Sequence, residues 1–279
     1  MPEPKAPVTL PPEILDKILE HIPTNGIEGR PTLIACALVA TRWTGPSQRR
    51  LFSSVSVHNW NYERWMNGVV LSGSKTHLLK YVRLLRHRRH IPDTGKRYLM
   101  RNLPKDSGEY FPALHNIRSL ELLNIEIEHI SEAGFRTCFS TFRETLTDLT
   151  LQNFDTPFSA FVTLVGYFPN ITTLQLCAPV VGPDEGTVPP LSRPLRGKIC
   201  LRNIYPSCME LFSRLAKLDL EYEELVLESC PWVSVRLLET ILQLGASTVK
   251  YLRLITNFQR EYPYDTMTSL HTLTRILTF

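Results

Sequence analysis

The sequence lacks the features of secreted, membrane and disulfide-linked proteins. The longest unbroken apolar run, residues 33–40, is eight residues long, whereas about 20 are needed to cross a bilayer. The six cysteines include no Cys-x-x-Cys pair, which favours reduced, buried thiols over a disulfide or zinc framework. The first residues contain three prolines and no apolar core of the kind a secretory signal has. We therefore expect a soluble cytoplasmic or nuclear protein.

Signatures of catalysis are also missing. There is no Gly-x-Ser-x-Gly motif, and the eight histidines do not combine with cysteines or carboxylates at metal-ligand spacing. Residues 68–76 resemble a phosphate-binding loop, but Ser74 separates the second glycine from Lys75, and in that motif the lysine follows the glycine directly. The sequence predicts no enzyme activity, no bound metal and no cofactor.

Charge is nearly balanced overall but not locally. Lys and Arg total 31 against 27 Asp and Glu, a net charge of +4, which is too small for a general nucleic-acid coat. Between Lys80 and Lys105, however, nine basic residues accompany one acid. Three interpretations remain open: a solvated helix or loop, an arginine surface for an acidic or phosphorylated protein segment, or a nuclear-import or nucleic-acid patch. Only Tyr98 lies within the segment to stack on a base, which disfavours nucleic acid.

An internal repeat is the strongest signal. Two apolar residues flanking one variable position recur with first members at 120, 149, 174, 199, 225 and 252, so the steps are 29, 25, 25, 26 and 27 residues. Strands are therefore predicted at 120–122, 149–151, 174–176, 199–201, 225–227 and 252–254. Weaker pairs predict strands near 55–57 and 82–84. The 38-residue step from 82 to 120 predicts a basic insertion at about residues 86–110.

Helical patterns separate these strands, as with Phe161, Leu164, Val165 and Phe168. A strand and a helix every 25 to 29 residues resembles the leucine-rich repeat, and Asn124, Asn153 and Asn203 fall near the asparagine or cysteine of that family. The resemblance implies an α/β solenoid over residues 54–279, curved into a horseshoe, in which each unit buries its apolar face against its neighbours.

Two parts of this region depart from the repeat. Residues 178–198 contain five prolines and predict an exposed loop, either a plain connection or a recognition loop. The chain stops within a further predicted strand near Ile276, without the polar cap that a solenoid needs. Either a partner or another copy covers that unit, or the chain is a shortened relative of a longer protein.

Three short helices are predicted before the repeats. In residues 10–22 the apolar side chains of Ile14, Leu15, Ile18, Leu19 and Ile22 share one helical face. Two prolines suit the first turn, and an acid there complements the helix dipole. A second helix is predicted over residues 33–40 and a third over 47–52. So small a module buries little apolar surface and is expected to pack on something else.

The residues of this module resemble an F-box. The family pattern is matched by Leu10, Pro11, Glu13, Ile14, Ile18, Leu38, Val39 and Trp43. With the repeats, the resemblance is to the F-box and leucine-rich-repeat proteins, in particular their expanded fungal group. It implies an F-box at residues 1–53 that binds the Skp adaptor, with Pro12 and Leu15 as further contacts, and a repeat domain that holds a protein substrate for a cullin-based ubiquitin ligase.

An alternative is a scaffold outside the ubiquitin system, in which the F-box-like helices only cap the solenoid. On a leucine-rich repeat, residues beside the paired leucines face the concave surface. With the basic run, they give the candidate substrate contacts Arg83, Arg86, Arg88, Arg89, Glu121, Asp148, Gln152, Gln175, Arg202, Tyr251 and Arg253. The acidic residues at 219–228 remain either a solvated edge or a site for a basic partner.

Overall fold

The protein has a mixed α/β fold built around one parallel sheet. A computed structural model describes residues 10–24, 28–58, 61–70, 72–73, 75–88, 114–124, 136, 139–182, 191, 193–204, 208–215, 218, 220–228 and 248–255. The eight strands of the sheet lie in chain order, and every pair is parallel. They are β1 (Ser54–His58), β2 (Leu84–Arg88), β3 (Ser119–Leu123), β4 (Asp148–Gln152), β6 (Thr173–Cys177), β8 (Leu195–Arg202), β9 (Leu220–Glu228) and β10 (Tyr251–Ile255).

The paired apolar residues form two continuous rows across this sheet. Leu120 lies opposite Leu149, which lies opposite Leu174, and the row continues through Ile199, Leu225 and Leu252. The second row starts two residues later in each strand. Because side chains alternate along a strand, both rows point to one side of the sheet. We call this side the covered face and the opposite side, which carries the intervening residues, the open face.

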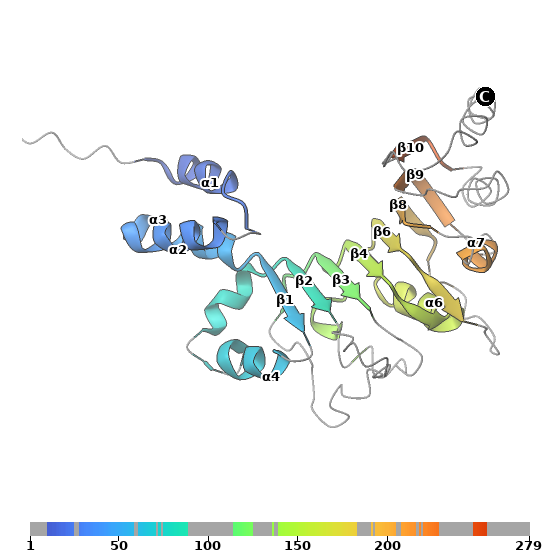
Figure 1. The fold of residues 1–279 in the computed structure, drawn as a ribbon, viewed down its shortest axis with the longest axis horizontal. Helices are drawn as coiled ribbons and strands as arrows, with labels where there is room; N and C mark the ends of the chain where they lie inside the picture. The colour runs from blue at the N-terminus through green and yellow to red at the C-terminus, as the bar shows by residue number, and fades with distance from the viewer. Residues whose placement is uncertain are drawn as a thin grey trace, which may run out of the picture.

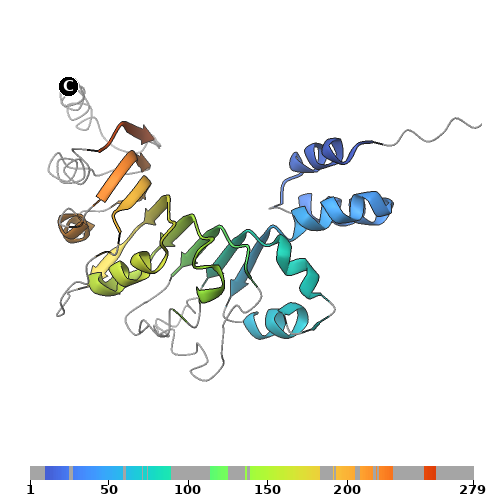
Figure 2. The same cartoon turned by 180° about the vertical axis from the view of Figure 1, so that it is seen from behind.

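Helices and turns cover one side of the curved sheet (Figures 1 and 2). They are α4 (Tyr62–Trp65), the π-helix η1 (Met66–Val70), the 3-10 helices η2 (Thr76–Tyr81) and η4 (Ser140–Phe142), α6 (Phe158–Tyr167) and α7 (Met209–Leu215). Such connections are required because a parallel strand must return to the same end of the sheet before the next strand begins. A second, two-stranded parallel sheet pairs β5 (Asp155–Pro157) with β7 (Val180–Gly182).

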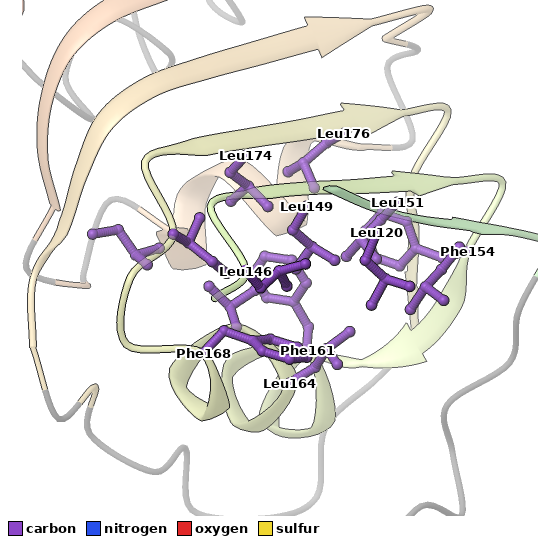
Figure 3. Close-up of a cluster of buried hydrophobic side chains, with 14 of the residues drawn as sticks. Leu120, Leu146, Leu149, Leu151, Phe154, Phe161, Leu164, Phe168, Leu174 and Leu176 are labelled. Carbon is purple, nitrogen blue, oxygen red and sulfur yellow. The ribbon is translucent and has the colours of Figure 1, made fainter. Parts of the chain in front are cut away.

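Leucines of the strands pack against phenylalanines of the connections in the core (Figure 3). Phe161 and Leu164 of α6 are fully buried, as the helical spacing predicts. Phe142 and Phe168 stack with their ring centroids 6.3 Å apart. This packing ties each connection to the next one, since Phe142 precedes β4 and Phe168 precedes β6.

The second strand lies three residues later than predicted. The sequence pattern at Val82 and Leu84 predicts a strand near 82–84, but β2 runs over Leu84–Arg88 and places Leu85 opposite Leu120. The misplacement arises because the second core position of β2 holds His87 instead of leucine. Arg86, His87 and Arg88 are therefore strand residues and not part of an insertion. The remainder of the predicted insertion, with Arg89, lies outside the described residues.

The turn after a strand repeats in four places. Asn124, Asn153, Ala178 and Asn203 each follow a strand directly and each have a positive φ, between 46° and 56°. Their amides donate to the next strand, as in Asn124 N to Gln152 O at 2.9 Å. Asparagine tolerates this left-handed conformation better than other residues with a side chain. The three asparagines singled out in the sequence thus share one backbone role.

The predicted proline-rich loop is shorter than residues 178–198. Val180–Gly182 form β7, and β8 already begins at Leu195. Proline lacks an amide hydrogen, but none of the five prolines lies within either strand, so both can form. Residues 183–190 lie outside the described residues, as does the end of the chain near Ile276.

Three helices precede the sheet: α1 (Pro12–Glu20), α2 (Gly29–Val39) and α3 (Thr41–Leu51). They lie beyond the β1 end of the sheet (Figure 1). The predicted third helix was too short, because α3 starts at Thr41 and continues through Pro46. Helix α1 is held to α3 by an ion pair between Asp16 and Arg49, at 3.2 Å, and by a hydrogen bond from Arg50 to the Glu20 carbonyl, at 3.1 Å.

Candidate functional site

An exposed apolar surface lies on the first two helices. It consists of Leu10, Ile14, Ile18, Ile34, Leu38 and Val39, which we call the N-terminal apolar surface. Leu38 is 81% exposed and Val39 76%. Only two other large apolar residues among those described, Tyr251 and Ile255, are comparably exposed. Clustered exposure of this kind marks interaction sites, whereas single exposed apolar residues are ordinary.

The apolar residues of α1 form two groups, one buried and one exposed. Leu15 and Leu19 are 3% and 1% exposed and face the inside of the helical module. Leu10, Ile14 and Ile18, spaced four residues apart along one side, are between 40% and 43% exposed. The single apolar face predicted from sequence is therefore too broad. Leu15, a predicted adaptor contact, is a core residue. Only the edge of the apolar face that carries Leu10, Ile14 and Ile18 is left for a partner.

Helix α2 is anchored by one residue and exposed along the rest of its apolar side. Leu33 is completely buried, and Ile34 one position later is 49% exposed. The chain becomes extended at Ala40, between α2 and α3, and the Thr44 hydroxyl donates to the Ala37 carbonyl at 2.9 Å. This closed corner holds Leu38 and Val39 at the surface.

The remaining predicted adaptor residues fall on the same module. Pro11, Pro12 and Glu13 are exposed at the start of α1, and Trp43 is half-buried in the first turn of α3. Trp43 therefore contributes partly to the packing of the helices. The sequence pattern predicts three helices here but does not separate the core of the module from its surface.

The second candidate surface is the open face of the sheet. The register places Glu121, Gln175 and Arg253 at equivalent positions on β3, β6 and β10. Asp148 and Tyr251 share the position two residues earlier, and Arg88, Gln152 and Arg202 the position two residues later. Every predicted substrate contact within a described strand therefore lies on the open face. Arg83 lies outside the strands: it precedes β2 and is exposed.

Ion pairs occupy several of these residues. Arg86 of β2 binds Glu121 of β3 with two hydrogen bonds, one of them 3.2 Å from Nη2 to Oε1. Arg202 of β8 binds Glu228 of β9, which raises the pKa of Arg202. Each of these two predicted substrate contacts is therefore paired with a glutamate of the next strand, which the sequence does not indicate. Neighbouring strands supply the partners because residues 25 to 35 positions apart become adjacent in the parallel register.

The acidic residues of β9 are matched in the same way. Glu224 lies 3.2 Å from Lys198 and 3.8 Å from Arg253, and Glu221 and Glu223 pair with Arg196 and Lys250 at 2.7 and 2.9 Å. This part of the acidic run forms cross-strand ion pairs, which favours the interpretation as a solvated edge over a site for a basic partner. The last three strands are electrically balanced at their surface.

Two cysteines lie on the open face under these ion pairs. Cys177 and Cys200 are 6% and 7% exposed. Burial raises the pKa of both thiols, so they stay protonated at neutral pH and are poor nucleophiles. In the described part of the chain, no three His, Cys, Asp or Glu side chains gather as metal ligands.

No protein-family model matches the chain, and no curated protein matches it either. Among the helices that the structure describes, none is long and apolar enough to span a bilayer. The candidate surfaces are consequently interpreted from their own geometry: one exposed apolar surface on helices and one polar face on a parallel sheet.

Proposed function

We propose that the protein is a non-catalytic substrate receptor of an Skp–cullin–F-box ubiquitin ligase. Residues 1–53 act as an F-box that binds the Skp adaptor, and residues 54–279 form a leucine-rich-repeat solenoid that binds the protein substrate. The N-terminal apolar surface is the observation that carries the proposal, because it exposes apolar side chains from two helices on a module too small to use them internally. Burying one such side chain against a partner contributes roughly 1.5 to 3 kcal/mol before association costs.

The sheet supports the second half of the proposal. Its strands follow chain order, and four of them, β3, β4, β6 and β8, are followed by the same left-handed turn, as stacked repeats would be. The open face presents hydrogen-bonding side chains such as Asp148, Gln152 and Gln175, which suit a protein surface or an extended segment. The receptor raises the local concentration of substrate, and the ligase performs the chemistry in the cytoplasm or nucleus.

Affinity capture with the Skp adaptor tests the proposal. Ile14→Asp and Leu38→Asp place a charge on the N-terminal apolar surface and are expected to abolish capture, since an unpaired buried carboxylate is costly. Ile255→Asp, at an exposed apolar residue of β10, serves as the matched control and should leave capture unchanged. Leu15→Asp is unsuitable because it would unfold the module.

Adaptor capture that ignores both substitutions would contradict the proposal and favour the scaffold alternative. In that case the helices only cap the sheet, and deleting residues 1–50 would lower the stability of the rest of the chain markedly. Capture under proteasome inhibition, followed by identification of the retained proteins, reports substrates in the same experiment.

A further inference from the structure

A cluster of basic residues lies at the end of the sheet where β2 and β3 begin. Lys80, Arg83 and Arg118 are all exposed. Within the described part of the chain, no carboxylate forms an ion pair with any of the three. We call these residues the basic edge. Lys80 and Arg83 belong to the basic run of the sequence, but Arg118 comes from beyond the predicted insertion and joins them only through the fold.

Hydrogen bonds fix the basic edge in place. The Arg83 carbonyl accepts from the amides of Arg118 and Ser119, at 2.9 and 3.0 Å, so the two arginines begin adjacent strands side by side. Asn116 links Lys80 to Arg83: its carbonyl accepts from Arg83 Nη1 at 3.3 Å, and its side-chain amide donates to the Lys80 carbonyl at 3.0 Å. The backbones are thus held close while the positive charges remain in solvent.

The row of residues level with Arg83 and Arg118 on the other strands ends in a pair of opposite charges. Farther along, equivalent positions hold Thr147 and Thr172, and the row finishes with Glu223 and Lys250, which form an ion pair at 2.9 Å. Like charges placed side by side on neighbouring strands destabilise a sheet. Asp148 begins the next strand, and its amide donates to the Arg118 carbonyl at 2.9 Å, but among the described residues its carboxylate forms no ion pair with Arg83 or Arg118. An anion bound from outside would relieve the repulsion between the two arginines.

We propose that the basic edge binds an anionic group, a carboxylate or a phosphate, on an extended segment of the protein substrate; this inference rests on the proposed receptor function. Adjacent strands are about 4.8 Å apart, so both guanidinium groups can reach one oxyanion in the forked geometry that arginine favours. On the open face of the adjacent strand β4, Thr150 lies three residues from the position level with Arg118 and can hydrogen-bond to the backbone of the same segment. Nucleic acid fits less well, because Tyr251 at the far end of the sheet is the only exposed large aromatic residue among those described.

Fluorescence anisotropy on the full-length protein tests the inference with three labelled probes of about 12 residues or nucleotides. One peptide alternates glutamate and serine, the second carries phosphoserine in place of glutamate, and the third probe is single-stranded DNA. We expect the double variant Arg83→Glu/Arg118→Glu to weaken peptide binding at least about tenfold. The matched control, Arg196→Glu/Lys250→Glu, makes the same charge change at the paired end and should alter binding less than about twofold.

The tighter of the two peptides identifies the source of the anion. The milder Arg83→Gln/Arg118→Gln variant should show the same direction of effect and protects against misfolding as the cause. Equal losses in the control and test variants would overturn the inference, as would DNA binding more tightly than both peptides. Adaptor capture by the same variants is measured separately: it should remain intact, and its absence from the unchanged protein would refute the receptor function while leaving the peptide result to stand on its own.

Discussion

At position 87 a histidine occupies a core position that is leucine on all six strands that follow β2 in the sheet. His87 is 4% exposed, opposite Val57 and Leu122. Burial, with a smaller contribution from His58, lowers its pKa from 6.5 to about 4. The imidazole is therefore neutral in the folded protein at neutral pH, as a buried base must be.

This shift predicts how stability depends on pH. Between pH 6.5 and 4 the unfolded chain binds a proton at His87 that the folded chain does not, so the free energy of unfolding falls as the pH falls through that window. The full shift corresponds to roughly 3 kcal/mol. Urea unfolding at several pH values should show a smaller loss for His87→Leu than for the unchanged protein. Identical pH dependence in both proteins would contradict the assignment.

Tyr222 is buried with its hydroxyl unsatisfied. The side chain is 2% exposed, and its oxygen has no hydrogen-bond partner among the described residues. Leaving a buried polar group unpaired costs about 1 to 3 kcal/mol. Tyr222→Phe should therefore raise the free energy of unfolding by about 1 kcal/mol in urea titrations. The control is Tyr251→Phe, at an exposed tyrosine, which should change it little; a destabilised Tyr222→Phe would refute this account.

In the turns that follow the strands, Ala178 occupies a position that is asparagine in the three equivalent turns. It adopts a φ of 46° where its equivalents at 124, 153 and 203 are asparagine. A left-handed conformation costs alanine about 1 kcal/mol or more. Ala178→Asn should thus raise the melting temperature, and the reciprocal Asn153→Ala should lower it. Asn153→Ala also removes the hydrogen bond to Asn124 Oδ1, at 3.1 Å, so the loss should exceed the gain. A lower melting temperature for Ala178→Asn would contradict the argument.

Elements with a repeated apolar pair could be predicted from sequence, and elements without one could not. Seven strands were located because both core positions in each are leucine, isoleucine or valine, a pattern that burial imposes directly. The predicted position of strand β2 was wrong because His87 interrupts its pair of apolar core residues. The predicted third helix was too short because a proline usually marks the boundary of a helix, whereas Pro46 lies inside α3.

The surfaces were less predictable than the core. Exposure of Ile14 and burial of Leu15 depend on where α3 packs against α1, which the spacing of apolar residues does not specify. The Arg86–Glu121 pair joins residues 35 positions apart and follows from the strand register. Arg118, for the same reason, could not be assigned to the basic edge from its place in the sequence.

Across the whole molecule, two surfaces with different chemistry are separated along the chain. Helices α1 and α2, which carry most of the N-terminal apolar surface, lie beyond the β1 end of the sheet (Figure 1), and the open face extends from β1 to β10. An apolar helical surface suits a permanent partner, whereas a polar face with local charge suits selective and reversible binding. This separation would let the receptor that we propose hold a substrate without blocking its adaptor.

The most direct test of the receptor function is the dissociation constant for the purified Skp adaptor, measured by calorimetry. The unchanged protein should bind with one-to-one stoichiometry, and Leu38→Asp should weaken binding at least about a hundredfold, since roughly 3 kcal/mol is lost when a buried apolar contact becomes an unpaired charge. Ile255→Asp should bind like the unchanged protein. No measurable binding by the unchanged protein, or equal affinity for all three proteins, would contradict the account.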